Sequence, residues 1–184
     1  MAKRTYVALG AAGLLALISG TQHAQAASAT EIEKEVDAAV KICEASVAGC
    51  EAVADKAKGM LVFPEVTKAG LGVGGSYGVG ALRVDDTTEG YYSTTAASIG
   101  LQAGAEKHSE IYMFLTDQAL ADFRASDGWK VGGDASVAVI DDGAAKNLDT
   151  FTSKHPVVVF VYGEQGLMGS LSVEGSKISP YTPE

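Results

Sequence analysis

The spacing of apolar residues differs between the first part of the chain and the rest. Between positions 30 and 47 apolar residues recur at intervals of four, four, three and four, at Ile32, Val36, Val40, Cys43 and Val47. This spacing predicts one face of an amphipathic helix, and such a face usually packs on the protein's own core. Thr30 followed three residues later by Glu33 predicts a capping box at its start, and 51–58 is expected to add a short helix that ends at Gly59.

From Met60 onward, short apolar or alternating runs are separated by glycine, a pattern typical of strands. We expect strands over 61–63, 69–77, 79–84, 91–102, 109–115, 129–140, 157–162, 167–173 and 176–178. Hairpin turns are expected at Asp85-Asp86 with Glu89-Gly90 and at 163–166. Connections this short favour antiparallel pairing, because parallel strands need crossovers of a dozen residues or more.

One segment in the second half of the chain has helical spacing instead. Residues 117–124 follow Thr116 as a cap and carry Ala119, Leu120 and Phe123 on one side. The fold class that these elements predict is α+β: a coiled antiparallel sheet or partly closed barrel, packed with the N-terminal helices and one short internal helix. We expect a helical segment over 27–56 and a β-rich domain over 57–184, together forming one globular unit.

Glycines stand at every second position of one predicted strand, at Gly70, Gly72 and Gly74. Strands normally avoid glycine. A stripe without side chains permits another backbone, a helix or an acyl chain to come close, and it also permits the sharp coiling of a small barrel. We favour the structural interpretation, coiling.

The first 26 residues have the features of a secretory signal peptide. Lys3 and Arg4 precede an apolar run over 7–18 and the small residues of 24–27, so we expect cleavage after Ala26. A lipid-anchored protein would need a cysteine where Thr21 follows Gly20. The sequence therefore predicts an exported protein, periplasmic or extracellular, without a lipid anchor.

The net charge argues against polyanionic partners. The chain has 23 acidic and 14 basic residues, a formal charge of −9. Cleavage would remove Lys3 and Arg4 and no acidic residue, leaving −11. Nucleic acid is a disfavoured partner on this balance.

Cys43 and Cys50 are the two cysteines. In an exported chain a disulfide between them is the first expectation. One continuous helix would hold their Cα atoms roughly 10 Å apart, beyond the ~7 Å limit for a disulfide, so the chain would have to turn, and Gly49 suits such a turn. The alternative is a pair of free thiols in a continuous helix.

The motifs that suggest catalysis lack the context their chemistry needs. Residues 74–78 fit G-x-S-x-G around Ser76, but a strand follows where a nucleophile elbow needs a helix. Residues 70–75 fit G-x-G-x-x-G, again without a following helix. His108, in a predicted polar turn over 106–109, and His155 are expected at the surface, and no spacing fits a zinc site. Asp141-Asp142 is interpreted as a turn. We predict no enzyme, no cofactor and no metal.

Several ordered blocks resemble the SYLF lipid-binding domain. The first, A-K-G-M-L-V-F-P-E-V-T-K-A-G-L-G-V-G-G-S-Y-G, covers 57–78. Further blocks are Y-Y-S at 91–93, A-S-I-G-L-Q-A-G at 97–104, F-L-T-D at 114–117 with Ala119, Leu120 and Phe123, S-D-G-W at 126–129, G-L-M at 166–168 and V-E-G-S-K-I at 173–178. Together they span most of the chain behind the leader.

The resemblance implies phospholipid binding. Eukaryotic relatives bind phosphoinositides with the help of a basic N-terminal segment, whereas the first helix here is largely acidic, so that specificity is not carried over. We expect apolar insertion by Leu61 and Phe63, flanked by the three lysines Lys56, Lys58 and Lys68. The alternative is that Leu61 and Phe63 are ordinary core. The rival function is a non-enzymatic structural or protein-interaction module of the cell envelope.

Overall fold

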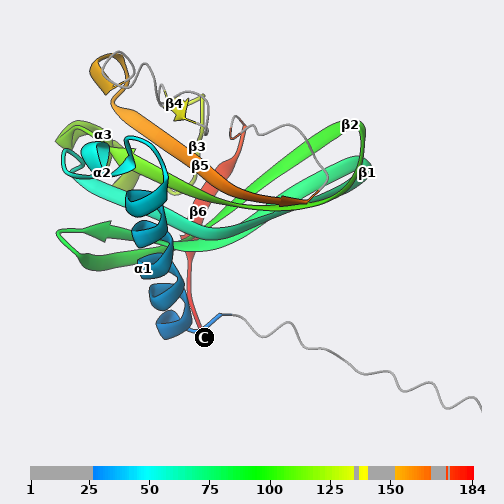
Figure 1. Ribbon diagram of the computed structural model, residues 1–184, viewed down its shortest axis with the longest axis horizontal. Helices are drawn as coiled ribbons and strands as arrows, with labels where there is room; N and C mark the ends of the chain where they lie inside the picture. Colours follow the sequence, from blue (N-terminus) through cyan, green and yellow to red (C-terminus); the bar gives the residue numbers. More distant parts are fainter. Residues whose placement is uncertain (1–26, 135–136, 141–151, 167–172, 174) are drawn as a thin grey trace, which may run out of the picture.

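The computed structural model describes residues 27–134, 137–140, 152–166, 173 and 175–184. The expectations for the leader, for the turn at 141–142 and for most of the strand at 167–173 lie outside these residues. The elements, in chain order, are α1 (Ala29–Ser46), α2 (Cys50–Ala54), β1 (Gly59–Val84), β2 (Thr87–Phe114), α3 (Asp117–Arg124), β3 (Trp129–Lys130), β4 (Val137–Ile140), β5 (Val157–Gly166) and β6 (Lys177–Tyr181). Figure 1 shows α1 lying across one face of a strongly curled sheet.

The first helix starts two residues earlier than its sequence pattern predicts. The capping box is formed by Ser28 and Glu31, not by Thr30 and Glu33. Ser28 Oγ accepts from the Glu31 N–H at 3.3 Å, and the Glu31 carboxylate accepts from the Ser28 N–H at 3.2 Å. Placing the cap at Ser28 leaves Thr30 exposed in the first turn. The predicted apolar face is confirmed, with Ile32, Val36, Ala39 and Cys43 buried.

Most of the predicted short strands merge into one long hairpin. β1 has 26 residues and β2 has 28, joined at Asp85 and Asp86, which both have positive φ. The turn predicted there is confirmed. The polar stretch at 106–109 is not a turn but part of β2, because its charged residues alternate between the two faces of the strand. Register shifts after Phe63 and after Leu71 let the ladder continue past Pro64 and the glycines.

This hairpin bends back on itself at residues 70–74, at the right-hand end in Figure 1. A Cβ on Gly70 would lie 2.5 Å from Gly74 Cα, and a Cβ on Gly80 would lie 1.8 Å from Val62 O. No side chain fits at either place. The glycine stripe therefore permits the close backbone approach and the coiling that the sequence predicts.

The sheet has the strand order β3-β6-β2-β5-β4, with β1 paired to β2 outside this path. It is mixed, not wholly antiparallel, because β4 runs parallel to β5. The prediction of a wholly antiparallel sheet is wrong for this pair of strands, because the segment between β4 and β5 is long enough for a crossover. The strand predicted over 129–140 is two strands, and β5 continues through the turn predicted at 163–166.

The curled sheet is a half-barrel with core on both of its faces, and α+β is confirmed as the fold class. One core cluster lies under α1 and α2 and includes Val62, Ile111, Met113, Val158 and Phe160. The other lies inside the curl, next to α3, and includes Leu61, Phe63, Tyr112, Phe114, Phe123 and Trp129. Neighbouring residues of β1 and β2 contribute to opposite clusters because side chains alternate along a strand.

Candidate functional site

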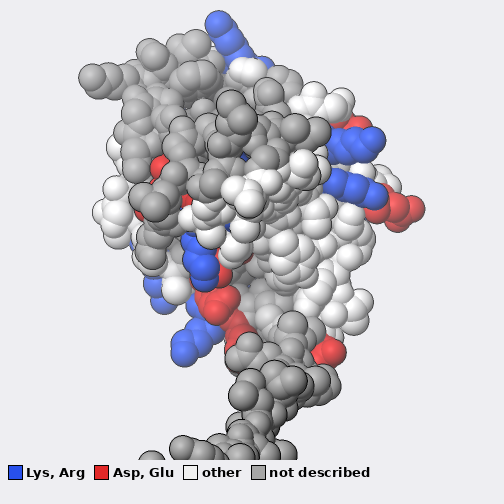
Figure 2. Space-filling view, turned by 90° about the vertical axis from the view of Figure 1, so that its right-hand side faces the viewer, with Lys and Arg blue, Asp and Glu red and all other residues white. Residues whose placement is uncertain are grey.

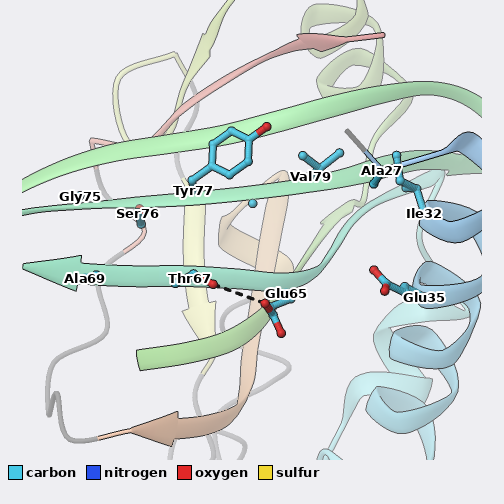
Figure 3. Close-up of a pocket in the computed structure, with 11 residues that line it drawn as sticks. Ala27, Ile32, Glu35, Glu65, Thr67, Ala69, Gly75, Ser76, Tyr77 and Val79 are labelled. Atoms are coloured by element: carbon cyan, nitrogen blue, oxygen red, sulfur yellow. Dashed lines mark hydrogen bonds between the residues drawn. The ribbon is translucent and has the colours of Figure 1, made fainter. Parts of the chain in front are cut away.

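A hollow lies between the start of α1 and the two limbs of β1 on either side of the bend (Figure 3). Its volume is about 650 Å³, within the usual range of ligand clefts. Its lining is mostly small or apolar: Ala27, Ile32, Glu35, Glu65, Thr67, Ala69, Gly75, Ser76, Tyr77, Gly78 and Val79. The doubled-back hairpin creates this space because Gly75 and Gly78 place no side chain in it.

Two carboxylates face the hollow from different elements, Glu35 from α1 and Glu65 from β1 (Figure 3). Glu65 Oε1 lies 2.7 Å from Lys107 Nζ and accepts from the Thr67 hydroxyl at 3.4 Å. Both acids are exposed. Burial, and to a smaller extent the neighbouring Tyr181, raises the pKa of Tyr77 above its usual value, so this phenol stays neutral at physiological pH.

Ser76 lines this hollow in the middle of β1, where its Cα pairs with Ala96 of β2. A strand continues on both sides of Ser76, as predicted, and the strand-to-helix turn of a nucleophile elbow is absent here. That Ser76 has a structural role stays a prediction.

The bend itself presents apolar side chains to solvent. Leu71 is 82% exposed and Val73 69%, and Tyr77 beyond them is 52% exposed. Figure 2 looks at this side of the molecule, and the part of its described surface to the right of the centre shows no Lys, Arg, Asp or Glu. No role was assigned to these residues from the sequence. The pattern that could have identified them is the Gly-Leu-Gly-Val-Gly alternation, in which Leu71 and Val73 occupy the positions between the glycines.

The structure does not bring the five predicted lipid-contact residues together. Leu61 and Phe63 are fully buried inside the curl, as the core alternative expects. Lys56 and Lys58 are exposed before the start of β1, whereas Lys68 is half-buried close to the bend. Lys58 and Lys68 are ten positions apart, roughly 30 Å at the rise of an extended chain. That these residues together form one lipid-contact segment stays a prediction.

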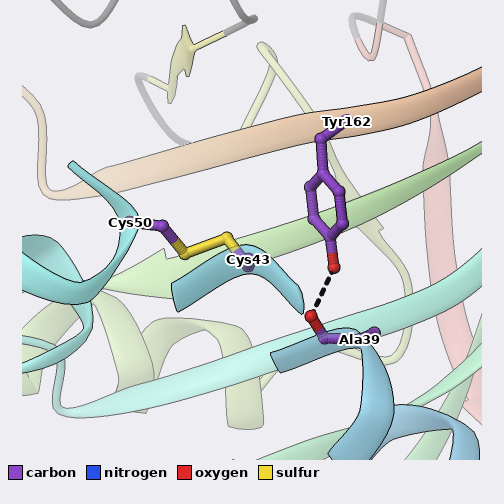
Figure 4. The surroundings of a disulfide bond; sticks show 4 residues. All are labelled: Ala39, Cys43, Cys50 and Tyr162. Carbon is purple, nitrogen blue, oxygen red and sulfur yellow. Dashed lines mark hydrogen bonds between the residues drawn. A yellow bond between two sulfur atoms is a disulfide. The ribbon is translucent and has the colours of Figure 1, made fainter. Parts of the chain in front are cut away.

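The predicted disulfide is present between Cys43 at the end of α1 and Cys50 at the start of α2 (Figure 4). Their Cα atoms are 5.8 Å apart, and Gly49 provides the turn with a φ of 83°. From β5, the buried Tyr162 hydroxyl donates to Ala39 O at 2.6 Å. These two links, with the ion pair of Arg83 and Asp37, hold α1 on the sheet beside the hollow.

The surface prediction for His108 is wrong. His108 is 6% exposed, because alternate residues of β2 point into the curl. His108 Nε2 lies 2.9 Å from Glu110 Oε1, and His108 Nδ1 lies 3.7 Å from Glu106 Oε1. His155 is half-buried ahead of β5.

Within the part of the chain that the structure describes, no three His, Cys, Asp or Glu side chains are grouped as a metal site requires. None of the described helices combines the length and the apolar character that a membrane crossing needs.

Comparison with known proteins gives one family. Residues 95–184 match the Ysc84 family, which is described as Las17-binding protein actin regulator. The match starts within β2 and runs to the end of the chain, so it includes the blocks from 97 onward that resemble SYLF but not those at 57–78 and 91–93. No curated protein matches the chain. The resemblance seen in the sequence is thus confirmed over residues 95–184, where the chain matches the Ysc84, or SYLF, domain family.

Proposed function

We propose that this protein is exported and binds phospholipid, and that it meets the bilayer with the bend of its long hairpin. The observation that carries the proposal is the exposure of Leu71 and Val73, two positions apart at the bend. Scattered exposed apolar residues are ordinary, but neighbouring ones on one surface are typical of contact sites. The match of residues 95–184 to the SYLF family supports lipid as the ligand, and the disulfide is compatible with export.

The expected strength follows from the number of side chains at the bend. Burying one large apolar side chain contributes about 1.5–3 kcal/mol, so Leu71 and Val73 together give roughly 3–6 kcal/mol. A lysine near an anionic surface adds about 1 kcal/mol, and Lys68 is the predicted lysine nearest the bend. Such energies correspond to reversible binding with Kd values from millimolar to tens of micromolar.

The hollow beside the bend supports a deeper contact than surface insertion alone. Its small and apolar lining can receive one acyl chain, while Glu35 and Glu65 at its margin disfavour an anionic headgroup close by. We therefore expect binding that depends weakly on salt, because apolar insertion is not screened by ions.

Leu61 and Phe63 do not contribute to this proposal in the folded state. Their contact with lipid stays a prediction that would require β1 to detach from the core, since both side chains are fully buried.

The test is co-sedimentation of the protein with zwitterionic and anionic vesicles at two salt concentrations. A Leu71→Ser, Val73→Ser variant should bind at least tenfold more weakly. Ile42→Ser is the matched control, because Ile42 is a 53% exposed apolar residue on α1. Circular dichroism verifies that both variants fold. Undiminished binding of the bend variant would refute the site, whereas failure of the wild-type protein to bind any vesicle would refute the lipid function.

Failure on all vesicles would favour the second candidate, a protein-interaction module. The family description names a binding partner and actin regulation for other members. In the described part of the chain β1 has β2 as its single strand partner, so a partner strand could add to its other edge.

A further inference from the structure

One exposed face of the sheet carries hydroxyl and ammonium groups on three neighbouring strands. The strand pairing places Thr95 of β2 opposite Lys177 of β6, and Lys177 opposite Lys130 of β3. Directly opposite residues have their side chains on the same face of a sheet, and these three are all exposed. The adjacent residues Ile178 and Trp129 are buried on the other face.

Two serines extend this face by one further pair. Ser93 of β2 lies opposite Ser179 of β6, two positions from Thr95 and Lys177. The Thr95 hydroxyl donates to Lys177 O at 3.4 Å, whereas neither serine hydroxyl forms a hydrogen bond with a described residue. A Cβ on Gly128 would lie 3.5 Å from Lys177 Nζ and 3.9 Å from Ser179 Oγ. The ammonium group and the serine hydroxyl therefore lie beside one position that has no side chain.

The two lysines form a like-charged pair across β3 and β6. Like charges at directly opposite positions destabilise a sheet. Within the described residues neither ammonium group has a carboxylate partner, although the chain has 23 acidic residues. Protection of a sheet edge by lysine accounts for Lys130 on β3. It does not account for Lys177, because β6 lies between β3 and β2.

Acidic side chains near this face accept hydrogen bonds from groups other than the lysine ammonium groups. Asp134 accepts from the main-chain N–H of Lys130 at 2.6 Å. Glu33 accepts from the hydroxyl of Tyr91 at 2.8 Å, further along the same face of β2. A bound anion would supply the negative charge that the lysine pair lacks.

The same face continues into the hollow beside α1. Tyr77 of β1 lines the hollow and lies opposite Thr95 of β2. Lys177 is therefore two strand spacings from Tyr77, roughly 10 Å. Glu35 and Glu65 face the hollow from α1 and from the other limb of β1 (Figure 3). A ligand with one apolar and one anionic end would thus place its apolar end in the hollow and its anionic end on the lysine side.

We propose that five residues form a binding site for a phosphate group, which we call the phosphate patch: Ser93, Thr95, Lys130, Lys177 and Ser179. Lysine ammonium groups bind phosphate as point charges, and the hydroxyls can donate to its oxygens. The patch deepens the proposed function and rests on it for the source of the phosphate, which we expect to be the headgroup of a lipid whose acyl chain occupies the hollow. Since apolar insertion supplies most of the attraction to a bilayer, the two lysines orient the lipid without making vesicle binding strongly dependent on salt.

The experiment follows the amide signals of the ¹⁵N-labelled full chain during titration with two soluble probes that form no bilayer. The probes are inorganic phosphate and dihexanoyl phosphatidylglycerol below its micelle concentration. We expect both to shift the amide signals of the phosphate patch. The Lys130→Gln, Lys177→Gln variant should bind each probe roughly tenfold more weakly.

The matched control is Lys34→Gln, Lys41→Gln, which removes the same charge from exposed positions of α1 and should bind both probes as the wild type does. Circular dichroism and the thermal midpoint verify folding. The Lys130→Gln, Lys177→Gln variant should be no less stable than the wild type, because it removes a repulsion between like charges.

The two probes separate the possible sources of the phosphate. Tighter binding of the short-chain lipid, with additional shifts at Tyr77 and Val79, assigns the patch to a lipid headgroup. Equal binding of both probes without shifts in the hollow assigns it to free phosphate.

The patch is overturned if neither probe shifts its signals, or if the Lys130→Gln, Lys177→Gln variant binds as tightly as the wild type. Because neither probe forms a bilayer, that result would leave the vesicle binding of the proposed function intact. Conversely, absent vesicle binding with phosphate binding retained would refute the bilayer function and not the patch.

Discussion

Gly80 offers the sharpest test of the doubled-back hairpin. A Cβ at this position would lie 1.8 Å from Val62 O and 2.9 Å from Cδ1 of the Phe63 ring. Ordinary contacts between a Cβ and a heavy atom begin near 3.4 Å, so Gly80→Ala would have to push the limbs of β1 apart by more than 1 Å. The atoms that the added Cβ would meet belong to the buried main chain and to the core, and none belongs to a flexible side chain that could move aside.

The expected cost exceeds that of ordinary overpacking. Extra methylenes in a packed core cost about 1–3 kcal/mol, and here the obstacle is a main-chain carbonyl in a paired strand. We expect a loss of about 4 kcal/mol or more, a large part of the 5–15 kcal/mol by which domains are stable. Gly90→Ala is the matched control, because its Cβ would meet the Tyr92 ring at an ordinary 3.4 Å. It should change stability by less than about 1 kcal/mol.

The assay is urea unfolding followed by the fluorescence of Trp129, the single tryptophan of the chain, which is buried in the inner core. Far-UV circular dichroism detects any variant that is already unfolded without urea. If Gly80→Ala proved as stable as Gly90→Ala, with an unchanged spectrum, the two limbs of β1 could not be packed against each other as described.

Three further predictions follow from the links around α1 and from the core. Reduction of the Cys43–Cys50 disulfide should lower stability by about 2 kcal/mol, because the loop it closes is short; the thermal midpoint with and without reductant measures this, and an unchanged midpoint would contradict it. Burial raises the pKa of Tyr162 to about 12 from 10.0, so the folded state retains a proton that the unfolded state releases. Stability is then unaffected below pH 10 and falls by about 1.4 kcal/mol per pH unit between 10 and 12; Tyr162→Phe should flatten this slope in alkaline unfolding curves, and an equal slope would exclude Tyr162 as its source. Phe63→Ser should lose about 3–5 kcal/mol as a core truncation; a variant that stays as stable as the wild type but no longer binds vesicles would instead restore the direct lipid contact first expected there.

Local signals near the ends of elements were readable from the sequence. The periodicity of Ile32, Val36 and Cys43 located α1, Thr116 marked the start of α3, and Gly49 allowed the turn that the disulfide needs. Each of these depends on residues within a few positions of one another. Helical spacing, capping and the maximum span of a disulfide act over a few residues, so they can be predicted from the sequence alone.

Contacts between distant residues were not readable in the same way. Whether Leu61 and Phe63 face lipid or core depends on the other limb of the hairpin and on β5, and the structure buries both. The burial of His108 likewise depends on β2 continuing without a break through 106–109, because side chains then alternate between its two faces. The polar residues around His108 led instead to the prediction of a turn.

The sequence by itself determined which segments are helical and where glycines permit close backbone approach, and it favoured the disulfide over free thiols. Only the tertiary structure decided that the hairpin doubles back at 70–74, which exposes Leu71 and Val73 and encloses Glu106 and Glu110. The physical reason is that side chains alternate between the two faces of a strand, so the local sequence does not decide which face is buried. The packing of remote segments selects the face that is buried, and that selection places apolar side chains in water and charged ones in the core.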